Sequence, residues 1–506
     1  MKNYCTRLLL LIFISFTGVC NYAQIVFHNA FGGFHQEIGY SGCLTYDGGY
    51  IICGSSLSFV TDIQNIYLVK CNEFGDTVWT KSYGQSGATI GYSIIETDDY
   101  GFLIAGSQGH GAYNGFLLKT DMNGTIMWAK NATGVNVFYS IDKTHDGGYI
   151  ATGYGGTTNT SIILIKVSDS GNVLWSKSLG SNTYEDRAYS VKQTSDYGFI
   201  VAGYTLGYGA GNYDAYLIKT DSLGNVQWSR TYGNTYSDYF YSVQETSDSG
   251  YIAIGVKGQY SYLVKTDNAG DTLWTKKYVM YFGKDVKQNP DKSYIMVATS
   301  PQYRINLVKT DPDGEVLWAK KIGGIHEEYG NFVTPIPHGG YFIIGRTNSF
   351  GAGQSDIFFV KTDSLGNTHT CHETDPSIVA LNTSTIVQSG CSSVNANISF
   401  SNITTYESNP PTIVTNICGY VNINSYTASD NFFILYPNPF NDFLKCDTEI
   451  DTPMTITVYN YMGQHIIEKT FLKSIEINTE MFPKGTYTFM LSDNEQIYKV
   501  GKIIKN

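Results

Sequence analysis

The sequence predicts an all-β protein in which a seven-bladed β-propeller is followed by a small β-sandwich. Three observations lead to this fold class: a tryptophan that returns at a nearly fixed spacing, two short motifs that return with it, and the composition. The chain of 506 residues holds 53 glycines and 41 tyrosines, and only 15% of its residues are charged. This chemistry argues against long surface helices and against a disordered chain, and the length exceeds that of one ordinary domain.

The chain begins with a segment that is typical of a secretory signal peptide. Lys2 and Arg7 stand before an apolar run from Leu8 to Phe16, and small and polar residues follow up to Ala23. We expect cleavage after Ala23. We expect no transmembrane span, because this run is too short and no later apolar stretch approaches about 20 residues. The alternative is lipoprotein processing at Cys20, although the residue before it is not small.

Residues 24–367 consist of seven copies of one unit. The six tryptophans stand in register, with successive spacings of 49, 47, 53, 46 and 44 residues. An Asp-x-Gly-aromatic motif and a Lys-Thr-Asp-x-x-Gly motif return with them, some copies being degenerate. A period of about 40–50 residues is typical of propeller blades. The tryptophans are Trp79, Trp128, Trp175, Trp228, Trp274 and Trp318.

Each copy predicts four short strands. In the copy from Tyr189 to Tyr232, tight turns at Asp196-Tyr-Gly198 and Asp221-Ser-Leu-Gly224 separate short apolar or alternating runs. Glycine tolerates the positive φ that such turns need, and four short strands in one unit make a propeller blade. Seven equivalent lysines in the Lys-Thr-Asp motif cannot form one active site, so we interpret them as structural.

The first and last copies complement each other. Residues Ile25 to Glu37 align with Val316 to Glu328, so the N-terminal segment is a fourth strand without its first three. The last copy ends at Gly366 and lacks a tryptophan. We therefore expect the N-terminal strand to complete the seventh blade and to pair two otherwise exposed sheet edges. Phe27 takes the place of the seventh tryptophan, and all seven aromatic residues are expected to pack between blades.

The longer loops of the predicted propeller are the expected binding surface. The tight Asp turns share one face, whereas the loops between strands two and three, and between blades, open on the other. These loops are rich in Tyr, Gly, Asn and Ser, which is the chemistry of adaptable recognition surfaces. The alternative is that they only form a solvated rim. The candidate binding residues are His110, Tyr113, Tyr208, Tyr213, Tyr236, Tyr239, Tyr303 and Arg304.

The spacing of the cysteine and histidine residues does not predict a metal site. Seven cysteines remain after signal removal, and disulfides are permitted outside the cytoplasm. No pair has Cys-x-x-Cys or zinc-finger spacing, and the group His369, Cys371 and His372 is a weak signal, so we expect no metal. We expect a disulfide between Cys391 and Cys418.

Two segments follow the repeats. Residues 368–431 are rich in Ser, Thr and Asn, and they predict a spacer or a small β-module. Residues 432–506 alternate polar and apolar positions between turns, which predicts a small β-sandwich.

The final segment closely resembles the C-terminal sorting domain of the type IX secretion system, type A. The landmark residues are Tyr436, Pro437, Asn438, Pro439, Gly463 and Gly485. The resemblance implies recognition by the type IX secretion machinery at the outer membrane of a Gram-negative bacterium. It also implies removal of the domain during export, after which the cargo is released or attached to the cell surface. An ordinary terminal Ig-like domain is the alternative.

The repeated units resemble Trp-containing bacterial propeller repeats of the PQQ-like kind. The motif Tyr-Leu-Val-Lys-Thr-Asp-x-x-Gly-x-x-x-Trp, as at residues 262–274, carries this resemblance. It implies the fold and no activity, and no set of residues maps onto a quinone site, so we expect no cofactor.

The sequence favours a recognition protein over other classes. A net charge of −11 argues against nucleic acid as a partner, because binding phosphate needs a basic patch. His-Glu-x-x-His, Gly-x-Ser-x-Gly and Walker motifs are absent, and we name no catalytic residue. We expect a monomeric exported propeller that binds glycan or protein through its loop face. The alternatives are a carbohydrate-active enzyme whose carboxylates converge from different blades and a structural surface protein.

Overall fold

The computed structural model describes residues 25–505 apart from short gaps. The gaps fall at 60–62, 85–86, 111, 157–158, 182, 338, 369–371, 397, 404, 411–412, 422–432, 437–439, 449–450, 461–464 and 494–496. The predicted signal peptide lies outside the described residues. The described chain is all-β, as expected, and divides into two compact units: residues 25–420, here the repeat domain, and residues from 421 onward, here the tail domain.

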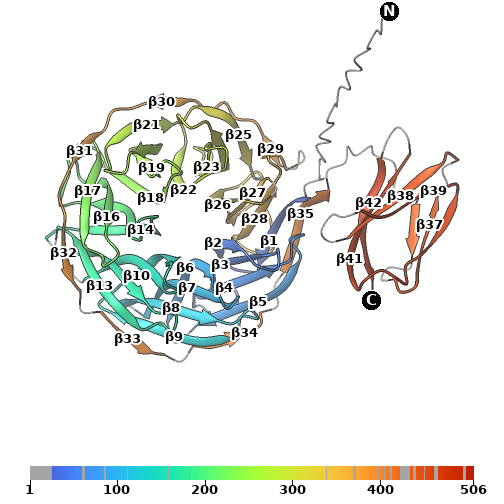
Figure 1. The fold of residues 1–506 in the computed structure, drawn as a ribbon, viewed down its shortest axis with the longest axis horizontal. Coiled ribbons are helices and arrows are strands. Elements are labelled where there is room, and N and C mark those ends of the chain that lie inside the picture. The colour runs from blue at the N-terminus through green and yellow to red at the C-terminus, as the bar shows by residue number, and fades with distance from the viewer. Residues whose placement is uncertain are drawn as a thin grey trace, which may run out of the picture. The chain divides into compact units, whose positions relative to one another are not determined.

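The described strands of the repeat domain form seven sheets of five strands each, and these repeated sheets resemble the blades of a propeller. Figure 1 shows them side by side around a ring, with the first strand of each sheet nearest the centre. The first strands are β2 (Glu37–Leu44), β6 (Ala88–Glu96), β10 (Val137–Lys143), β14 (Asp186–Gln193), β18 (Asp238–Glu245), β22 (Tyr281–Gln288) and β26 (Glu328–Pro335).

The second and third strands form the middle of each sheet and are almost entirely buried. The second strands are β3 (Tyr50–Ser56), β7 (Phe102–His110), β11 (Tyr149–Gly155), β15 (Phe199–Thr205), β19 (Tyr251–Lys257), β23 (Tyr294–Thr299) and β27 (Tyr341–Thr347). The third strands are β4 (Asn65–Cys71), β8 (Ala112–Thr120), β12 (Ser161–Val167), β16 (Asp214–Thr220), β20 (Tyr260–Thr266), β24 (Ile305–Thr310) and β28 (Asp356–Thr362).

The fourth strands carry the tryptophan register. They are β5 (Thr77–Gly84), β9 (Ile126–Thr133), β13 (Val173–Gly180), β17 (Val226–Gly233), β21 (Thr272–Tyr278), β25 (Val316–Ile322) and, in the last sheet, β1 (Ile25–Gly32). Strand β1 pairs antiparallel with β28, and Phe27 stands opposite Lys361. The first and last repeat units therefore share one sheet.

The structure of residues 373–421, here called the belt, differs from the sequence interpretation. We expected a spacer or a small β-module at 368–431. Instead the belt adds a fifth strand to the outer edge of every sheet, in the reverse order of the units, so that it runs round the outside of the ring (Figure 1). Its strands are β29 (Glu373–Thr374), β30 (Ala380–Asn382), β31 (Ile386–Gln388), β32 (Ser392–Asn395), β33 (Ser399–Asn402), β34 (Tyr406–Ser408) and β35 (Ile413–Val421).

Side-chain contacts hold the belt to the sheets. Lys276 Nζ donates to Asn382 Oδ1 at 2.7 Å, and Thr80 Oγ1 donates to the carbonyl of Pro410 at 3.1 Å. Phe400 packs against the core beneath it. A strand added to an exposed edge pairs backbone groups that would otherwise face solvent, which explains how so polar a segment folds.

The expected disulfide between Cys391 and Cys418 is wrong. Cys391 lies between β31 and β32, whereas Cys418 lies in β35, and Figure 1 shows these strands on different sides of the ring. A disulfide requires Cα atoms within about 7 Å of each other. The side chain of Cys391 is instead hydrogen-bonded to Tyr216.

The tryptophans pack against the next sheet. The ring of Trp228 lies 5.7 Å from that of Tyr251. It also covers Gly270, whose φ of +80° and lack of space for a Cβ atom explain the glycine of the Asp-x-x-Gly turn. Phe27 has the equivalent place in β1, with its ring 6.2 Å from that of Tyr50.

The lysines of the Lys-Thr-Asp motif connect the third strand of a sheet to a turn of the same sheet. Their side chains are largely buried, and six of the seven pair with the surface aspartate of the Asp-x-Gly turn. The seventh unit has His338 in place of this aspartate, and its lysine, Lys361, donates to the backbone carbonyl of Glu73 at 3.3 Å. Burial alone raises the pKa of Asp248, but hydrogen bonds from Thr246 and Lys265 bring it down to about 2. The described pairs are Lys70–Asp47, Lys119–Asp99, Lys166–Asp146, Lys219–Asp196, Lys265–Asp248 and Lys309–Asp291.

The tail domain consists of two sheets with one core. One sheet holds β36 (Phe433–Tyr436), β37 (Phe443–Thr448) and β40 (Ser474–Asn478). The other holds β39 (His465–Phe471), β38 (Met454–Asn460), β41 (Gly485–Ser492) and β42 (Ile497–Lys505). Tyr436 ends β36 and Gly485 begins β41. Pro437, Asn438, Pro439 and Gly463 lie outside the described residues.

Truncating a tryptophan tests the packing between sheets. Trp228→Ala removes a partly buried ring that joins two sheets, so we expect a loss of about 2–4 kcal/mol in the free energy of unfolding, measured by denaturant titration. Leu223→Ala, at a side chain that is 61% exposed, serves as the control. Equal stability of the two variants would contradict the packing described.

Truncating the belt tests its role at the sheet edges. We expect residues 24–421 to melt cooperatively. Residues 24–368 should melt at a lower temperature and aggregate, because seven outer edges are then unpaired. Differential scanning calorimetry with light scattering measures both. Equal melting temperatures with a monomeric shorter chain would show that the belt is not needed.

Candidate functional site

The innermost strand of every sheet carries a β-bulge. At one point each inner strand has a residue without an opposite partner on the second strand, and β22 has two such residues. A bulge re-aims the extra side chain, and bulges are frequent beside functional sites. The unpaired residues are Tyr40, Tyr92, Tyr139, Tyr189, Tyr241 and Asn331, with Phe282 and Lys284 in β22.

Seven of these side chains form what we call the central ring: Tyr40, Tyr92, Tyr139, Tyr189, Tyr241, Lys284 and Asn331. Neighbouring tyrosine rings lie 5.0 to 5.1 Å apart. Lys284 Nζ lies 3.9 Å from the ring centre of Tyr241, and Asn331 Nδ2 donates to the carbonyl of Gly39 at 2.8 Å. All seven side chains are half-buried. They therefore encircle the centre of the repeat domain.

The serine after three of the ring tyrosines connects one inner strand to the next. Ser93, Ser140 and Ser190 each accept a hydrogen bond from a backbone N–H of the next inner strand, at 3.2 to 3.4 Å. In β22 the place of the serine is taken by Asp285, which accepts from Ser242 at 2.6 Å and from the N–H of Val333 at 3.2 Å. These bonds fix the backbone from which the central ring projects.

Two of the predicted binding residues, Tyr213 and Tyr239, meet on the loop face. Their rings lie 5.6 Å apart at an interplanar angle of 32°, and each lies 5.0 Å from the ring of Tyr204. Tyr204 in turn lies 5.9 Å from Tyr189 of the central ring. Tyr204 itself is only 4% exposed, so a buried tyrosine connects the partly exposed rings of Tyr213 and Tyr239 with the central ring.

Arginines stack on further tyrosines near the centre. Arg187 lies 4.2 Å from the ring centre of Tyr154, and Arg346 lies 4.2 Å from that of Tyr329. Tyr303, a predicted binding residue, lies 5.7 Å from Tyr329. These stacks add aromatic contacts near the central ring at Tyr154 and at Tyr329.

The other predicted residues have no described ring contact with these tyrosines, although the charge of Tyr113 contributes to the raised pKa of Tyr92 in the central ring. Tyr113 is half exposed at the start of β8, and Tyr236 is exposed in the loop between β17 and β18. The ring of Tyr208 packs against Gly390 of the belt, and its hydroxyl donates to the carbonyl of Gly180 at 3.4 Å. The side chain of His110 lies outside the described residues.

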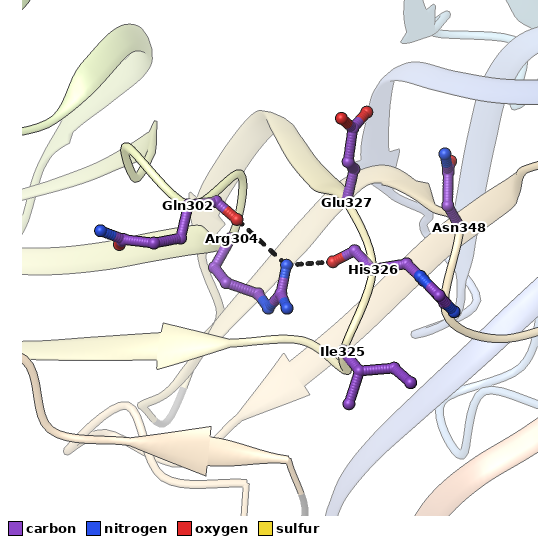
Figure 2. A pocket seen from close by; sticks show the side chains of 6 residues that line it. All are labelled: Gln302, Arg304, Ile325, His326, Glu327 and Asn348. Carbon is purple, nitrogen blue, oxygen red and sulfur yellow. Dashed lines mark hydrogen bonds between the residues drawn. The ribbon is translucent and has the colours of Figure 1, made fainter.

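Arg304 forms hydrogen bonds to the backbone of two loops. Figure 2 shows it at an open pocket of about 650 Å³, donating to the backbone carbonyls of Gln302 and His326. Its Nε lies 3.4 Å from the buried carboxylate of Glu328. These contacts hold the guanidinium between the two loops, at the edge of the pocket that it lines.

The central ring was missed in the sequence although a signal exists. A Tyr-Ser dipeptide stands at the same place in five units: Tyr40-Ser41, Tyr92-Ser93, Tyr139-Ser140, Tyr189-Ser190 and Tyr241-Ser242. The sixth and seventh units have Lys284-Asp285 and Asn331-Phe332 at that place. A repeated dipeptide with two exceptions indicates a position whose side chain has a shared role.

Buried carboxylates occupy the junctions between sheets. Asp214 and Asp238 converge beside Gly233, where they accept backbone N–H groups of Gly211 and Asn234 at 3.0 and 2.9 Å. Burial raises the pKa of Asp238 to about 6, and the nearby charge of Asp214 adds to the rise. Asp356, beside Glu37, is raised to about 6 for the same two reasons. These acids hold loop backbones.

No metal site emerges from the described side chains. Within the ranges that the structure describes, no three His, Cys, Asp or Glu side chains are grouped so that they could hold a metal ion. His369 and Cys371, two members of the group considered in the sequence, lie outside those ranges.

Comparison with known families identifies the tail. Residues 434–506 match the model of the secretion system C-terminal sorting domain. The protein is therefore exported to the cell surface or secreted, and its tail interacts with the type IX secretion machinery, as the sequence resemblance implied. The described residues include no helix with the length and apolar character needed to cross a bilayer.

Solved structures show distant similarity. A protein of unknown function from Bacteroides caccae is 12% identical with a TM-score of 0.37, over 58% of this chain and 93% of that chain. Sqt1 from Chaetomium thermophilum is 10% identical with a TM-score of 0.42, over 69% and 89%. The Pan2 WD40 domain of Neurospora crassa is 8% identical with a TM-score of 0.43, over 65% and 90%. No curated protein matches the chain.

The junction carboxylates predict an unusual pH dependence. The folded-state pKa values of Asp238 and Asp356 lie above the ordinary value of 3.8. The folded protein therefore binds more protons than the unfolded chain between about pH 4 and 6, and stability should rise as the pH falls through this window. Asp238→Asn should raise the free energy of unfolding at pH 7.5 by about 1–3 kcal/mol and flatten the profile.

The matched control is Asp248→Asn. The pKa of Asp248 is depressed, so loss of its charge should lower stability at pH 7.5. Denaturant titrations from pH 4.5 to 8 measure both variants. Stability that rises with pH across this range in the wild type would contradict the raised pKa values.

Proposed function

We propose that the repeat domain is a closed seven-bladed β-propeller which, after export, recognises a carbohydrate at its loop face and central ring. The single observation that supports this most is the series of ring contacts from the partly exposed Tyr213 and Tyr239 through the buried Tyr204 to the central ring. The pairing of β1 with β28 supports the closure. The N-terminal segment acts as a cleaved signal, and the mature protein is a monomer that is released or attached to the outer membrane.

The chemistry of the surface suits a sugar ring. Tyrosine offers a flat apolar face for C–H groups and a hydroxyl for hydrogen bonds to sugar hydroxyls. Burial raises the pKa of all five ring tyrosines, that of Tyr241 to about 12. Their hydroxyls therefore stay protonated and remain hydrogen-bond donors at neutral pH.

Recognition is favoured over hydrolysis by where the carboxylates lie. A glycosidase needs two carboxyl groups that reach the sugar. Asp214, Asp238 and Asp356 are at most 1% exposed, and they hold loop backbones. Asp142 and Glu185 are partly exposed, but their carboxylates pair with Lys192 and Arg187, each at 3.0 Å.

A glycan array tests this proposal. Residues 24–421 should bind a subset of glycans, and Tyr239→Ala should weaken a hit by about tenfold or more, because stacking and desolvation by an aromatic anchor are lost. Isothermal titration calorimetry measures the affinity. Tyr46→Ala is the matched control, because Tyr46 is 77% exposed and stacks with Tyr100 on the turn face.

Three outcomes would contradict the proposal. They are no binding by the wild type, equal losses at Tyr239 and Tyr46, and release of reducing ends that Asp142→Asn abolishes. The last outcome would support the enzyme alternative. If the domain bound a protein and no glycan, the binding site would stand, but carbohydrate as its ligand would be refuted.

A further inference from the structure

Strand β22 departs from the other inner strands at the central ring. It carries two register shifts against β23 where the others carry one, and this leaves both Phe282 and Lys284 unpaired on the backbone. Phe282 has a φ of +33° and is 40% exposed. A second bulge next to the first gives this strand two re-aimed side chains in place of one.

Lys284 is a cation without an anionic partner. Its Nζ lies 3.9 Å from the ring centre of Tyr241 and 5.5 Å from that of Phe282. Among the described residues, no ion pair or hydrogen bond engages this ammonium group. Burial lowers the pKa of Lys284 to about 8, and no acid contributes to that pKa, so the group is still mainly charged at neutral pH.

The neighbouring charges do not neutralise Lys284. Further along the inner strands, Lys192 pairs with Asp142 at 3.0 Å, and Lys287 pairs with Asp285 at 2.5 Å. Each of these pairs is neutral, so Lys284 adds an unbalanced positive charge near the centre of the ring. The total charge of the protein is −11. An anion is therefore attracted to this place and repelled by the rest of the molecule.

The loops near Lys284 are short. Only Val279 and Met280 connect β21 to β22, whereas residues 181–185 connect β13 to β14. Strands β19 and β20, in the preceding sheet, are joined by Gly258 and Gln259 alone. The two-residue connection at Val279 and Met280 directly precedes this end of β22, where Phe282 is 40% exposed, so a ligand can reach it from the loop face.

We propose that Lys284 binds the carboxylate of a uronic acid residue in an acidic glycan. The inference rests on the proposed function, and it names the substrate class and a specificity-determining residue. The ammonium group donates a charge-assisted hydrogen bond to the carboxylate. Phe282 and Tyr241 pack on either side of that contact, and the neighbouring tyrosine hydroxyls meet the sugar hydroxyls.

The test compares acidic with neutral polysaccharides. The acidic probes are polygalacturonate, alginate and hyaluronan, and the neutral probes are galactan, mannan and dextran. The wild-type chain should prefer one acidic probe, and Lys284→Met should lose about tenfold or more in affinity for it. Lys284→Arg should retain part of the affinity. Isothermal titration calorimetry at pH 6.5 and low salt gives the values.

Two controls separate binding from folding. Lys292→Gln removes an exposed lysine beyond the far end of β22 and should leave the affinity unchanged. The melting temperature of Lys284→Met should not fall, because the change removes a buried, unpartnered charge. A second readout is acetylation of Lys284 by acetic anhydride, followed by mass spectrometry, which the bound acidic probe should suppress.

The outcomes distinguish the two proposals. If the wild type binds neutral and acidic probes equally, or Lys284→Met keeps the acidic preference, the role of Lys284 is refuted while carbohydrate recognition stands. If the wild type binds none of the six probes, the glycan array is also empty and Lys284 acetylation is never suppressed, both proposals fall.

Discussion

The repeat domain depends on the pairing of its sheet edges. A sheet in a ring has an outer edge whose N–H and C=O groups invite pairing with another chain, and seven sheets present seven such edges. The belt covers all of them, and β1 supplies the fourth strand that the last unit lacks. The two ends of the repeat domain therefore both contribute strands to the sheet of β26–β28, and each of the seven described sheets of the repeat domain has a fifth strand.

This framework positions the central ring. The bulged residues project from inner strands that the serine bonds tie to one another, and the tryptophans and glycine turns hold each sheet against the next. The repeat thus presents one side chain seven times, and the units differ in what they present: five tyrosines, Lys284 and Asn331. The turn glycine at the position of Gly270 repeats in all seven units, and the position of Trp228 is aromatic in all seven. The units that differ at the central position make the ring asymmetric and give it a charge.

Much of the fold could be predicted from the sequence, because period, turn glycines and alternation are local signals. The units, their turns and the aromatic role of Phe27 were visible in this way. The belt was not, because its strands of two to nine residues have no period of their own and take their register from the edges they cover. The central ring was also missed, because a bulge decides where Tyr189 or Lys284 points. The contacts of Arg304 could not be predicted either, because a sequence does not show which backbone carbonyls a guanidinium reaches.

The central claim is that every outer edge of the ring is paired by the belt. Hydrogen–deuterium exchange of residues 24–421, read by mass spectrometry at peptide resolution, tests it directly. The account predicts that the fourth strands and the belt strands β30 to β35 exchange slowly and together, at rates that approach those of β3 and β4. Fast exchange in the belt and at the outer amides of the fourth strands, with slow exchange confined to the inner three strands, would contradict it.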